Sequence, residues 1–138
     1  YKNQNSSWYV NNGIDISDLK SNHYDFVMST IALQHIPVYD IRRSLIKDIL
    51  RTLKNEGLFS FQMAYGEDVK KFKRISSYFS NEWDAVGTNS IHDVRVQDEK
   101  QLVDDLLEIG FSDIETYVRE SFSDSNHAQW IYVKCFKK

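Results

Sequence analysis

The sequence has few of the residues that mark secreted, membrane-spanning or nucleic-acid-binding proteins. Its 138 residues include one cysteine, Cys135, which excludes an intrachain disulfide and fits a reducing compartment such as the cytoplasm. No apolar run approaches the roughly 20 residues that a membrane helix needs. The formal net charge of -3 argues against a surface built to bind phosphate backbones, so we expect neither a membrane nor a nucleic-acid partner.

Proline and glycine are also scarce. There is one proline, Pro37, and the five glycines are scattered, so no G-x-G-x-G loop is present to hold a phosphate or a nucleotide. The four histidines have no spacing to each other or to the cysteine that is typical of a metal site. What remains is a globular composition, 41% hydrophobic and 27% charged, at a length that suits one domain over residues 1–138.

Hydrophobic patterning in the first half predicts a strand, a helix and a strand. Asp25–Ser29 is a short apolar run typical of a buried strand. After Pro37, with Asp40 as a candidate N-cap, apolar residues fall on one helical face, and Asn55–Gly57 is expected to end that helix. Leu58–Met63 reads as the next strand. Short joints between these elements predict a parallel, right-handed crossover.

The second half predicts a further helix and a hairpin. Glu67–Ser80 is irregular but helical in pattern, and Asp98–Gly110 carries a capping-box start and a glycine stop. Ser112–Glu120 and Ala128–Phe136 are expected to pair antiparallel, the latter covered on both sides with Trp130 and Tyr132 in the core. The predicted fold is therefore α/β, a mostly parallel sheet with helices on its faces and an antiparallel hairpin at one edge. A variable segment is expected at about 66–97.

The order of these elements and motifs resembles the C-terminal two-thirds of a class I S-adenosylmethionine-dependent methyltransferase, a Rossmann-like fold. The stretches that carry the resemblance are "NNGIDISDL" (11–19), "YDFVMSTIALQHIP" (24–37), "ILRTLKNEGLFSFQ" (49–62), "LLEIGF" (106–111) and "QWIYVKCFKK" (129–138). Together they cover nearly the whole chain except 67–97. The resemblance implies S-adenosylmethionine as cofactor and a small molecule as methyl acceptor.

The resemblance also implies where the cofactor would lie. Ligands of open α/β sheets bind at the carboxyl ends of strands, and small residues there let a ligand approach the backbone. The implied floor of the site is Ser29, Thr30 and Ile31, with Gln34 and His35 on the turn above. Asp15 would accept a hydrogen bond from the adenine amino group and Ile16 would offer its backbone N–H to the ring, since adenine presents a donor beside an acceptor.

The chain departs from the family at its start. The glycine-rich loop and the strands around it are missing, and we expect the chain to begin just before the third strand, at about Ser7–Val10. In the family's strand order, 3-2-1-4-5-7-6, this leaves Asp25–Ser29 as an exposed edge that attracts other strands. The chain would repair it by dimerising, by folding back its N-terminal segment, or by binding another chain. Homodimerisation is the preferred expectation.

Each candidate residue also has a structural interpretation. The stretch around Asp15 is ordinary turn chemistry, and a histidine at position 35 either packs the helix against the sheet or acts as a general base. In the variable segment, Trp83, His92 and Arg95 either build an acceptor pocket or belong to a solvated loop. No Ser-His-Asp order surrounds Ser29 and Thr30.

Two functions follow from these observations. The first is an enzyme that transfers a methyl group from S-adenosylmethionine to a small molecule, chemistry that needs mainly proximity and few dedicated side chains. The second is a non-catalytic α/β module, a gene fragment or a degenerate subunit, that self-associates through its exposed sheet edge. An unrelated flavodoxin-like or kinase-like domain would need a phosphate-binding loop, which the sequence lacks.

Overall fold

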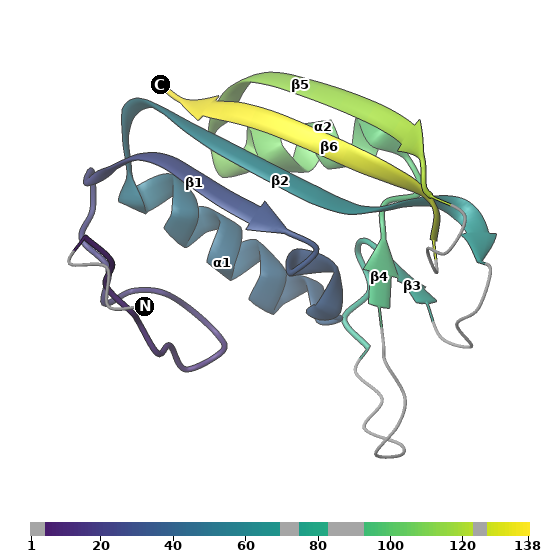
Figure 1. Cartoon of the computed structure of the whole chain (residues 1–138), viewed down its shortest axis with the longest axis horizontal. Coiled ribbons are helices and arrows are strands. Elements are labelled where there is room, and N and C mark those ends of the chain that lie inside the picture. The colour runs from purple at the N-terminus through teal and green to yellow at the C-terminus, as the bar shows by residue number, and fades with distance from the viewer. Residues whose placement is uncertain (1–4, 70–74, 83–92, 123–126) are drawn as a thin grey trace.

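A computed structural model describes residues 5–69, 75–82, 93–122 and 127–138, which form a sheet with two α-helices packed against it (Figure 1). The main sheet has the strand order β1-β2-β6-β5, and β3 and β4 form a small second sheet. The elements in chain order are β1 (Tyr24–Thr30), the 3-10 turn η1 (Leu33–His35), α1 (Tyr39–Thr52), β2 (Leu53–Val69), β3 (Ile75–Ser77), β4 (Asp93–Arg95), α2 (Glu99–Ile109), β5 (Phe111–Glu120) and β6 (His127–Lys137).

The pairing of the main sheet confirms the α/β class and both predicted connections. β1 and β2 pair parallel through the α1 crossover, and β5 and β6 form the C-terminal antiparallel hairpin. β6 also pairs antiparallel with β2. The four-stranded sheet is therefore mixed, with one parallel pairing among its three, where the sequence predicted a mostly parallel sheet.

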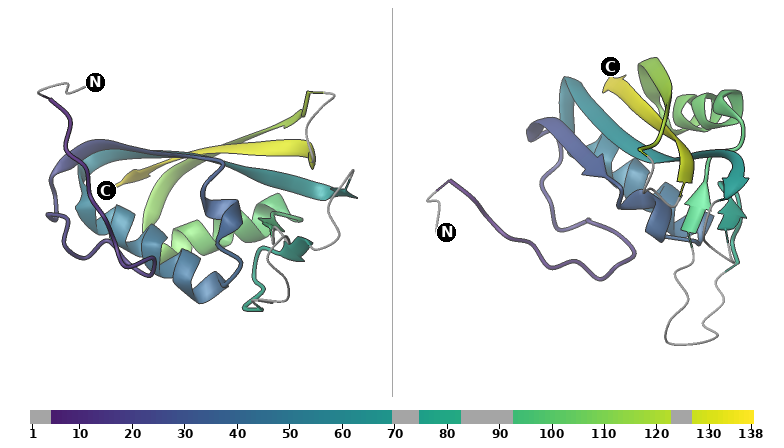
Figure 2. Two further views of the ribbon diagram at one scale, coloured as in Figure 1. Left: turned by 60° about the horizontal axis from the view of Figure 1, so that its bottom comes forward. Right: turned by 45° about the vertical axis from the view of Figure 1, so that its right-hand side comes forward.

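Both α-helices lie on the same face of the sheet (Figure 2), and the sequence predicted helices packed on the sheet without saying that one face would carry both. Alternate residues of the central strands, such as Phe59 and Ile131, are buried in one cluster with Ile46 of α1 and Leu106 of α2. The opposite face of β6 is open, so Trp130 and Tyr132 are only partly buried. The expectation that they belong to the core is wrong, because no described element covers that face.

The capping residues predicted from the sequence are correct for α2 and wrong for α1. In α2, the Asp98 side chain caps the Lys100 N–H at 2.9 Å and Gly110 ends the helix with a φ of +115°, as predicted. In α1, the N-cap is Val38 and not Asp40, which lies in the first turn. That helix ends at Thr52, earlier than the predicted stop at Asn55–Gly57, because β2 already begins at Leu53. Neither described helix has the length and apolarity needed to cross a membrane.

Two predicted elements are absent from the described residues. Residues Ser7–Val10, where a strand was expected, form no strand and pair with none of the described strands. The expected helix at Glu67–Ser80 is wrong where the structure describes it, since β2 continues to Val69 and β3 occupies Ile75–Ser77. β2 pairs with β6 over most of its length, and this long-range pairing overrides the helical pattern of the local sequence.

Buried polar groups tie α1 to its neighbours. Arg42 is completely buried, and its guanidinium donates hydrogen bonds to the backbone carbonyls of Ile36 and Tyr78. Asp105 of α2 accepts hydrogen bonds from the Tyr39 hydroxyl at 2.6 Å and from the Tyr78 hydroxyl at 2.9 Å. This network fixes the segment after β3 against both helices.

Candidate functional site

The chain turns sharply at the carboxyl end of β1, beside the small β3–β4 sheet (Figure 1). Ser29 is half-buried, Thr30 and Ile31 are exposed, and η1 begins within two residues. Ser29 and Thr30 are small, and they leave the backbone open to approach at this edge. The three residues proposed as the floor of a ligand site are thus adjacent at one strand end.

Ile31 has an unusual backbone conformation at this turn. Its φ is +59°, a left-handed value that is a true outlier for a β-branched residue. The side chain is 41% exposed, so burial of the isoleucine does not explain the strain. Strained residues persist where the surroundings hold them, and they cluster at ligand sites. The strain marks this turn as a candidate functional position.

Replacing Ile31 with glycine is expected to raise the free energy of unfolding by about 1 kcal/mol, because glycine adopts positive φ without strain. Urea denaturation measures the change. Ile14→Gly is the matched control, since Ile14 is similarly exposed and its φ is not positive. That control is expected to be neutral or destabilising. Equal effects of the two substitutions would show that Ile31 stores no strain.

The turn after β1 brings His35 against a buried carboxylate. His35 Nδ1 lies 2.6 Å from Asp93 Oδ1, and His127 Nε2 lies 3.1 Å from Asp93 Oδ2. The side chains of Asp93 and His127 are 2% and 4% exposed, whereas that of His35 is 49% exposed. The cluster therefore reaches from the interior to solvent through the His35 ring.

Asp93 remains ionised in this cluster. Burial alone would raise its pKa, but the hydrogen bonds from His127 and His35 outweigh burial and hold the pKa below the ordinary aspartate value. The described residues contain no group of histidine, cysteine and acidic side chains arranged to hold a metal ion. The cluster is thus a carboxylate hydrogen-bonded to two imidazole rings, an arrangement of the kind that orients an imidazole for proton transfer.

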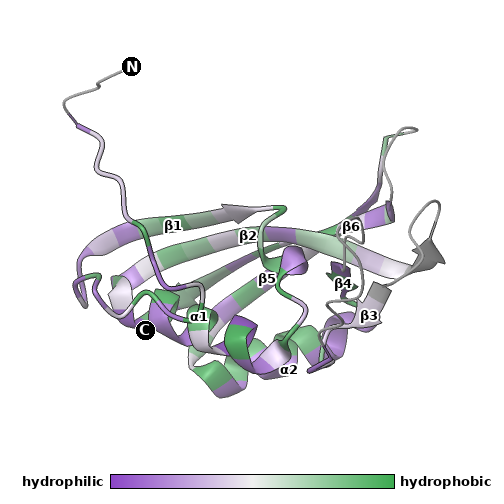
Figure 3. Ribbon diagram, turned by 90° about the horizontal axis from the view of Figure 1, so that it is seen from below, coloured by the Kyte–Doolittle hydropathy of each residue, from purple (hydrophilic) through white to green (hydrophobic). Residues whose placement is uncertain are grey.

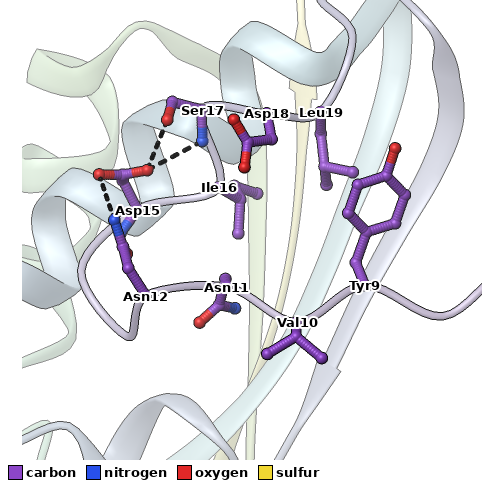
Figure 4. Close-up of a pocket in the computed structure, with 9 residues that line it drawn as sticks. All are labelled: Tyr9, Val10, Asn11, Asn12, Asp15, Ile16, Ser17, Asp18 and Leu19. Carbon is purple, nitrogen blue, oxygen red and sulfur yellow. Dashed lines mark hydrogen bonds between the residues drawn. The ribbon is translucent and has the colours of Figure 1, made fainter.

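Asp15 lies in a different part of the molecule, in the loop before β1. A pocket of about 160 Å³ is lined by residues of this loop alone: Tyr9, Val10, Asn11, Asn12, Asp15, Ile16, Ser17, Asp18 and Leu19 (Figure 4). The Asp15 carboxylate accepts hydrogen bonds from Ser17 and Asn12, which lower its pKa. The residue is a charged acceptor, but the pocket includes none of the residues at the end of β1.

No protein-family model and no curated protein sequence matches this chain. Solved structures with the same fold are found. A SAM-dependent methyltransferase from Methanosarcina mazei aligns with a TM-score of 0.66 and 18% identity, over 94% of this chain and 66% of its own. An N-methyltransferase from Bradyrhizobium japonicum with S-adenosylhomocysteine aligns with a TM-score of 0.57 and 14% identity, over 95% of this chain and 54% of its own. Phosphoethanolamine N-methyltransferase 2 from Haemonchus contortus, in complex with S-adenosyl-L-methionine, aligns with a TM-score of 0.57 and 16% identity, over 86% of this chain and 34% of its own.

The chain has a class I methyltransferase fold. It spans between one third and two thirds of the length of these solved structures. The structural alignments establish the fold. The sequence identities, all below one fifth, are too low to indicate the methyl acceptor.

In this methyltransferase fold, one predicted cofactor contact is already occupied. The backbone N–H of Ile16 donates to Asp48 Oδ2 at 3.0 Å, so it does not offer itself to an adenine ring as predicted. Arg51 also donates to the Ile16 carbonyl at 3.0 Å. Two α1 side chains, Asp48 and Arg51, therefore hold this loop against the helix.

Gln34 also faces inward rather than toward a ligand. It is 1% exposed, and its Oε1 accepts a hydrogen bond from the Ala64 N–H at 3.0 Å. In this arrangement Gln34 fastens η1 to β2 of the methyltransferase fold. Gln34 therefore supports the turn that carries His35 at the end of β1.

The three residues predicted to bind the methyl acceptor are not seen at the end of β1 in the part of the chain that the structure describes. Trp83 and His92 lie outside the described residues. Arg95, in β4, is 8% exposed, so its side chain is not held out toward a substrate acid as the sequence suggested. Sequence reasoning also missed Asp93 and His127, which lie 58 and 92 positions from His35. No local motif signals them, and only the fold brings them together.

Proposed function

We propose that this chain is part of an S-adenosylmethionine-dependent methyltransferase that acts on a small molecule. The observation that carries the proposal is the end of β1, where a strained turn leads directly to a half-exposed histidine held by a buried aspartate. The fold supports the same conclusion, because open α/β sheets bind ligands at the carboxyl ends of their strands.

The residues at this strand end suit the methionine portion of the cofactor. When bound, S-adenosylmethionine supplies a methyl group on a sulfonium centre. Ser29, Thr30 and Ile31 would form the floor beneath it, since Thr30 and Ile31 are exposed at the strand end. Asp15 would accept from the adenine amino group, whereas Ile16 could offer its N–H to the ring only after release from Asp48. The adenine half of the site is therefore the less complete half in this chain.

The acceptor is proposed to be a small molecule, in line with the small-molecule N-methyltransferases among the similar structures. Methyl transfer depends mainly on in-line geometry, so the site needs few dedicated side chains. His35 is the candidate general base because its ring is half-exposed beside the strand end.

We also propose a cytoplasmic protein, since Cys135 is the one cysteine of the sequence and has no disulfide partner within the chain. The thiol is buried, and this burial raises its pKa to about 12, so it remains protonated.

Calorimetric titration with S-adenosylhomocysteine tests the proposed function. We expect micromolar binding by the chain, and Thr30→Phe is expected to weaken it at least tenfold by filling the floor of the site, about 1.4 kcal/mol or more. Met28→Phe is the matched control, because Met28 is exposed two positions earlier on the same strand and is expected to leave binding unchanged. Asp15→Ala is also expected to abolish binding. Absence of binding by the folded wild-type chain would overturn the proposal.

A second candidate function is a non-catalytic module that self-associates through β1. β1 is an edge of the sheet, and Phe26 and Met28 are 51% and 66% exposed on it. Figure 3 shows a hydrophobic stretch within β1, between more hydrophilic ends. Its one charge, Asp25, is neutralised by Lys54 at 2.8 Å, whereas the opposite edge strand β5 carries several charges that discourage pairing.

Light scattering in the calorimetry buffer distinguishes the two functions. A homodimer that does not bind S-adenosylhomocysteine would favour the module. Pairing of β1 with its copy would join two sheets into one and bring Phe26 and Met28 beside side chains of the copied strand, so Met28→Lys, which adds a charge to each side of this pairing, is expected to return the chain to a monomer. A monomer that binds S-adenosylhomocysteine would leave the enzyme as the better interpretation.

A further inference from the structure

The buried Asp93 carboxylate joins elements that are far apart in the chain. Asp93 begins β4, His35 ends η1 and His127 begins β6. Each carboxylate oxygen has its own histidine partner, at 2.6 Å and 3.1 Å. Because both partners are fixed by different elements, the carboxylate cannot rotate without losing one of them.

The hydrogen-bonding chemistry determines which nitrogen carries the proton in each ring. An ionised carboxylate only accepts, so His35 Nδ1 and His127 Nε2 must each donate to Asp93. Gln34 Nε2 lies 3.4 Å from the same His127 nitrogen, but a protonated nitrogen cannot accept from it. The Gln34 amide orientation is itself set, because its oxygen accepts from the Ala64 N–H.

The consequence is a defined tautomer for the exposed ring. With its proton on Nδ1, His35 has an unprotonated Nε2, which has no hydrogen-bond partner among the described residues. A histidine without such a partner favours the opposite tautomer, with the proton on Nε2 and no basic nitrogen at that position. Asp93 therefore decides whether His35 can accept a proton from a molecule at the end of β1.

We propose that Asp93 and His127 are positioning residues, which hold His35 as the Nδ1–H tautomer so that Nε2 accepts the proton of a methyl acceptor. This inference rests on the proposed function and deepens it, because the acceptor must then be a hydroxyl or a protonated amine. In the step, the O–H or N–H bond of the acceptor breaks and its proton bonds to Nε2. The electron pair stays on the acceptor atom, which would use it to bond the methyl carbon as the methyl–sulfur bond of the cofactor breaks and that bonding pair stays on the sulfur. The imidazolium formed is stabilised by Asp93 and returns its proton to solvent through the exposed side of the ring.

Nitrogen NMR of the imidazole rings tests the proposal. In the 15N-labelled full chain at about pH 8, above the ordinary histidine pKa, we expect His35 Nε2 to resonate as an unprotonated ring nitrogen. Asp93→Asn is expected to move the proton of His35 to Nε2. Asp25→Asn, which removes a surface carboxylate paired with Lys54, is expected to leave the His35 spectrum unchanged. His23 serves as an internal reference because its described ring contact is with Tyr24.

The wild-type spectrum tests the proposed tautomer of His35 even if the Asp93→Asn variant fails to fold. A wild-type His35 protonated on Nε2 would overturn the positioning role, and so would an Asp93→Asn variant with the original tautomer. The same sample is then titrated with S-adenosylhomocysteine. If His35 has the expected tautomer and no resonance shifts on titration, the proposed methyltransferase function fails while the positioning of His35 stands.

Discussion

Replacing Arg42 with alanine is expected to lower the free energy of unfolding by about 4 kcal/mol, because it leaves a large buried cavity and two backbone carbonyls without a donor. The side chain is completely buried, and its guanidinium donates to the carbonyls of Ile36 and Tyr78. It also lies 4.8 Å from the centre of the Tyr78 ring. Truncation leaves two carbonyls without their donor and a cavity in place of a large side chain.

Urea denaturation and thermal unfolding measure this loss. At this chain length, about 4 kcal/mol corresponds to a fall in Tm of roughly 10–20 °C. The matched control is Arg43→Ala, the neighbouring arginine of the same helix. Its side chain is 25% exposed and contacts Asp105 at 3.2 Å, so about 1 kcal/mol is expected. If the two alanine substitutions lower the free energy of unfolding equally, burial of Arg42 is not what stabilises this region.

Replacing Asp105 with alanine is expected to cost about 3 kcal/mol, because hydrogen bonds to a charged group contribute more than neutral ones. Asp105 is 4% exposed and accepts from the Tyr39 hydroxyl, the Tyr78 hydroxyl and Arg43. Alanine leaves the buried Tyr78 hydroxyl without its acceptor. Glu108→Ala is the control, since that carboxylate is exposed and meets Arg43 only at 3.6 Å.

The same network makes stability depend on alkaline pH. Burial, followed by the hydrogen bond to Asp105, raises the pKa of Tyr39 to about 12, and burial raises the pKa of Tyr78 well above its ordinary value. In the unfolded chain both tyrosines ionise near about pH 10. The folded state then keeps protons that the unfolded state releases. The stabilisation of the folded state by these two protonated tyrosines is therefore complete below about pH 10, and it is lost as the pH rises toward 12.

Urea denaturation over this alkaline range measures the slope. Tyr78→Phe is expected to flatten it, because phenylalanine has no proton to retain. Tyr117→Phe is the matched control, since Tyr117 is 64% exposed on β5 and is expected to leave the slope as it is in the wild type. A wild-type stability that stays constant from about pH 10 to 12 would contradict the assignment of Tyr39 and Tyr78 to this network.

Local patterns predicted those parts of the fold whose hydrogen bonds or apolar faces lie within one segment. The run Asp25–Ser29 became β1 because its residues suit a strand in any sheet. The Asp98 cap and the Gly110 stop bounded α2 correctly, because both act on the neighbouring backbone. The order of the motifs then identified the class I methyltransferase fold.

Local patterns failed where a distant partner decides the outcome. Glu67–Ser80 has a helical pattern, yet its first part continues β2, whose pairing partner β6 lies at the far end of the chain. Ser7–Val10 has a strand-like sequence, but none of the described strands pairs with it. Trp130 and Tyr132 resembled core residues, but burial depends on what covers a face, and no described element covers theirs.

The candidate site divides in the same way. The sequence by itself determined that small residues followed by a histidine end β1, because strand, turn and histidine are contiguous in the chain. Only the tertiary structure decided that Asp93 meets that histidine and His127 meets Asp93, and that Gln34 turns inward while Asp48 takes the Ile16 N–H. These contacts join residues 30 to 58 positions apart, and a hydrogen bond across such a separation exists only after the chain has folded.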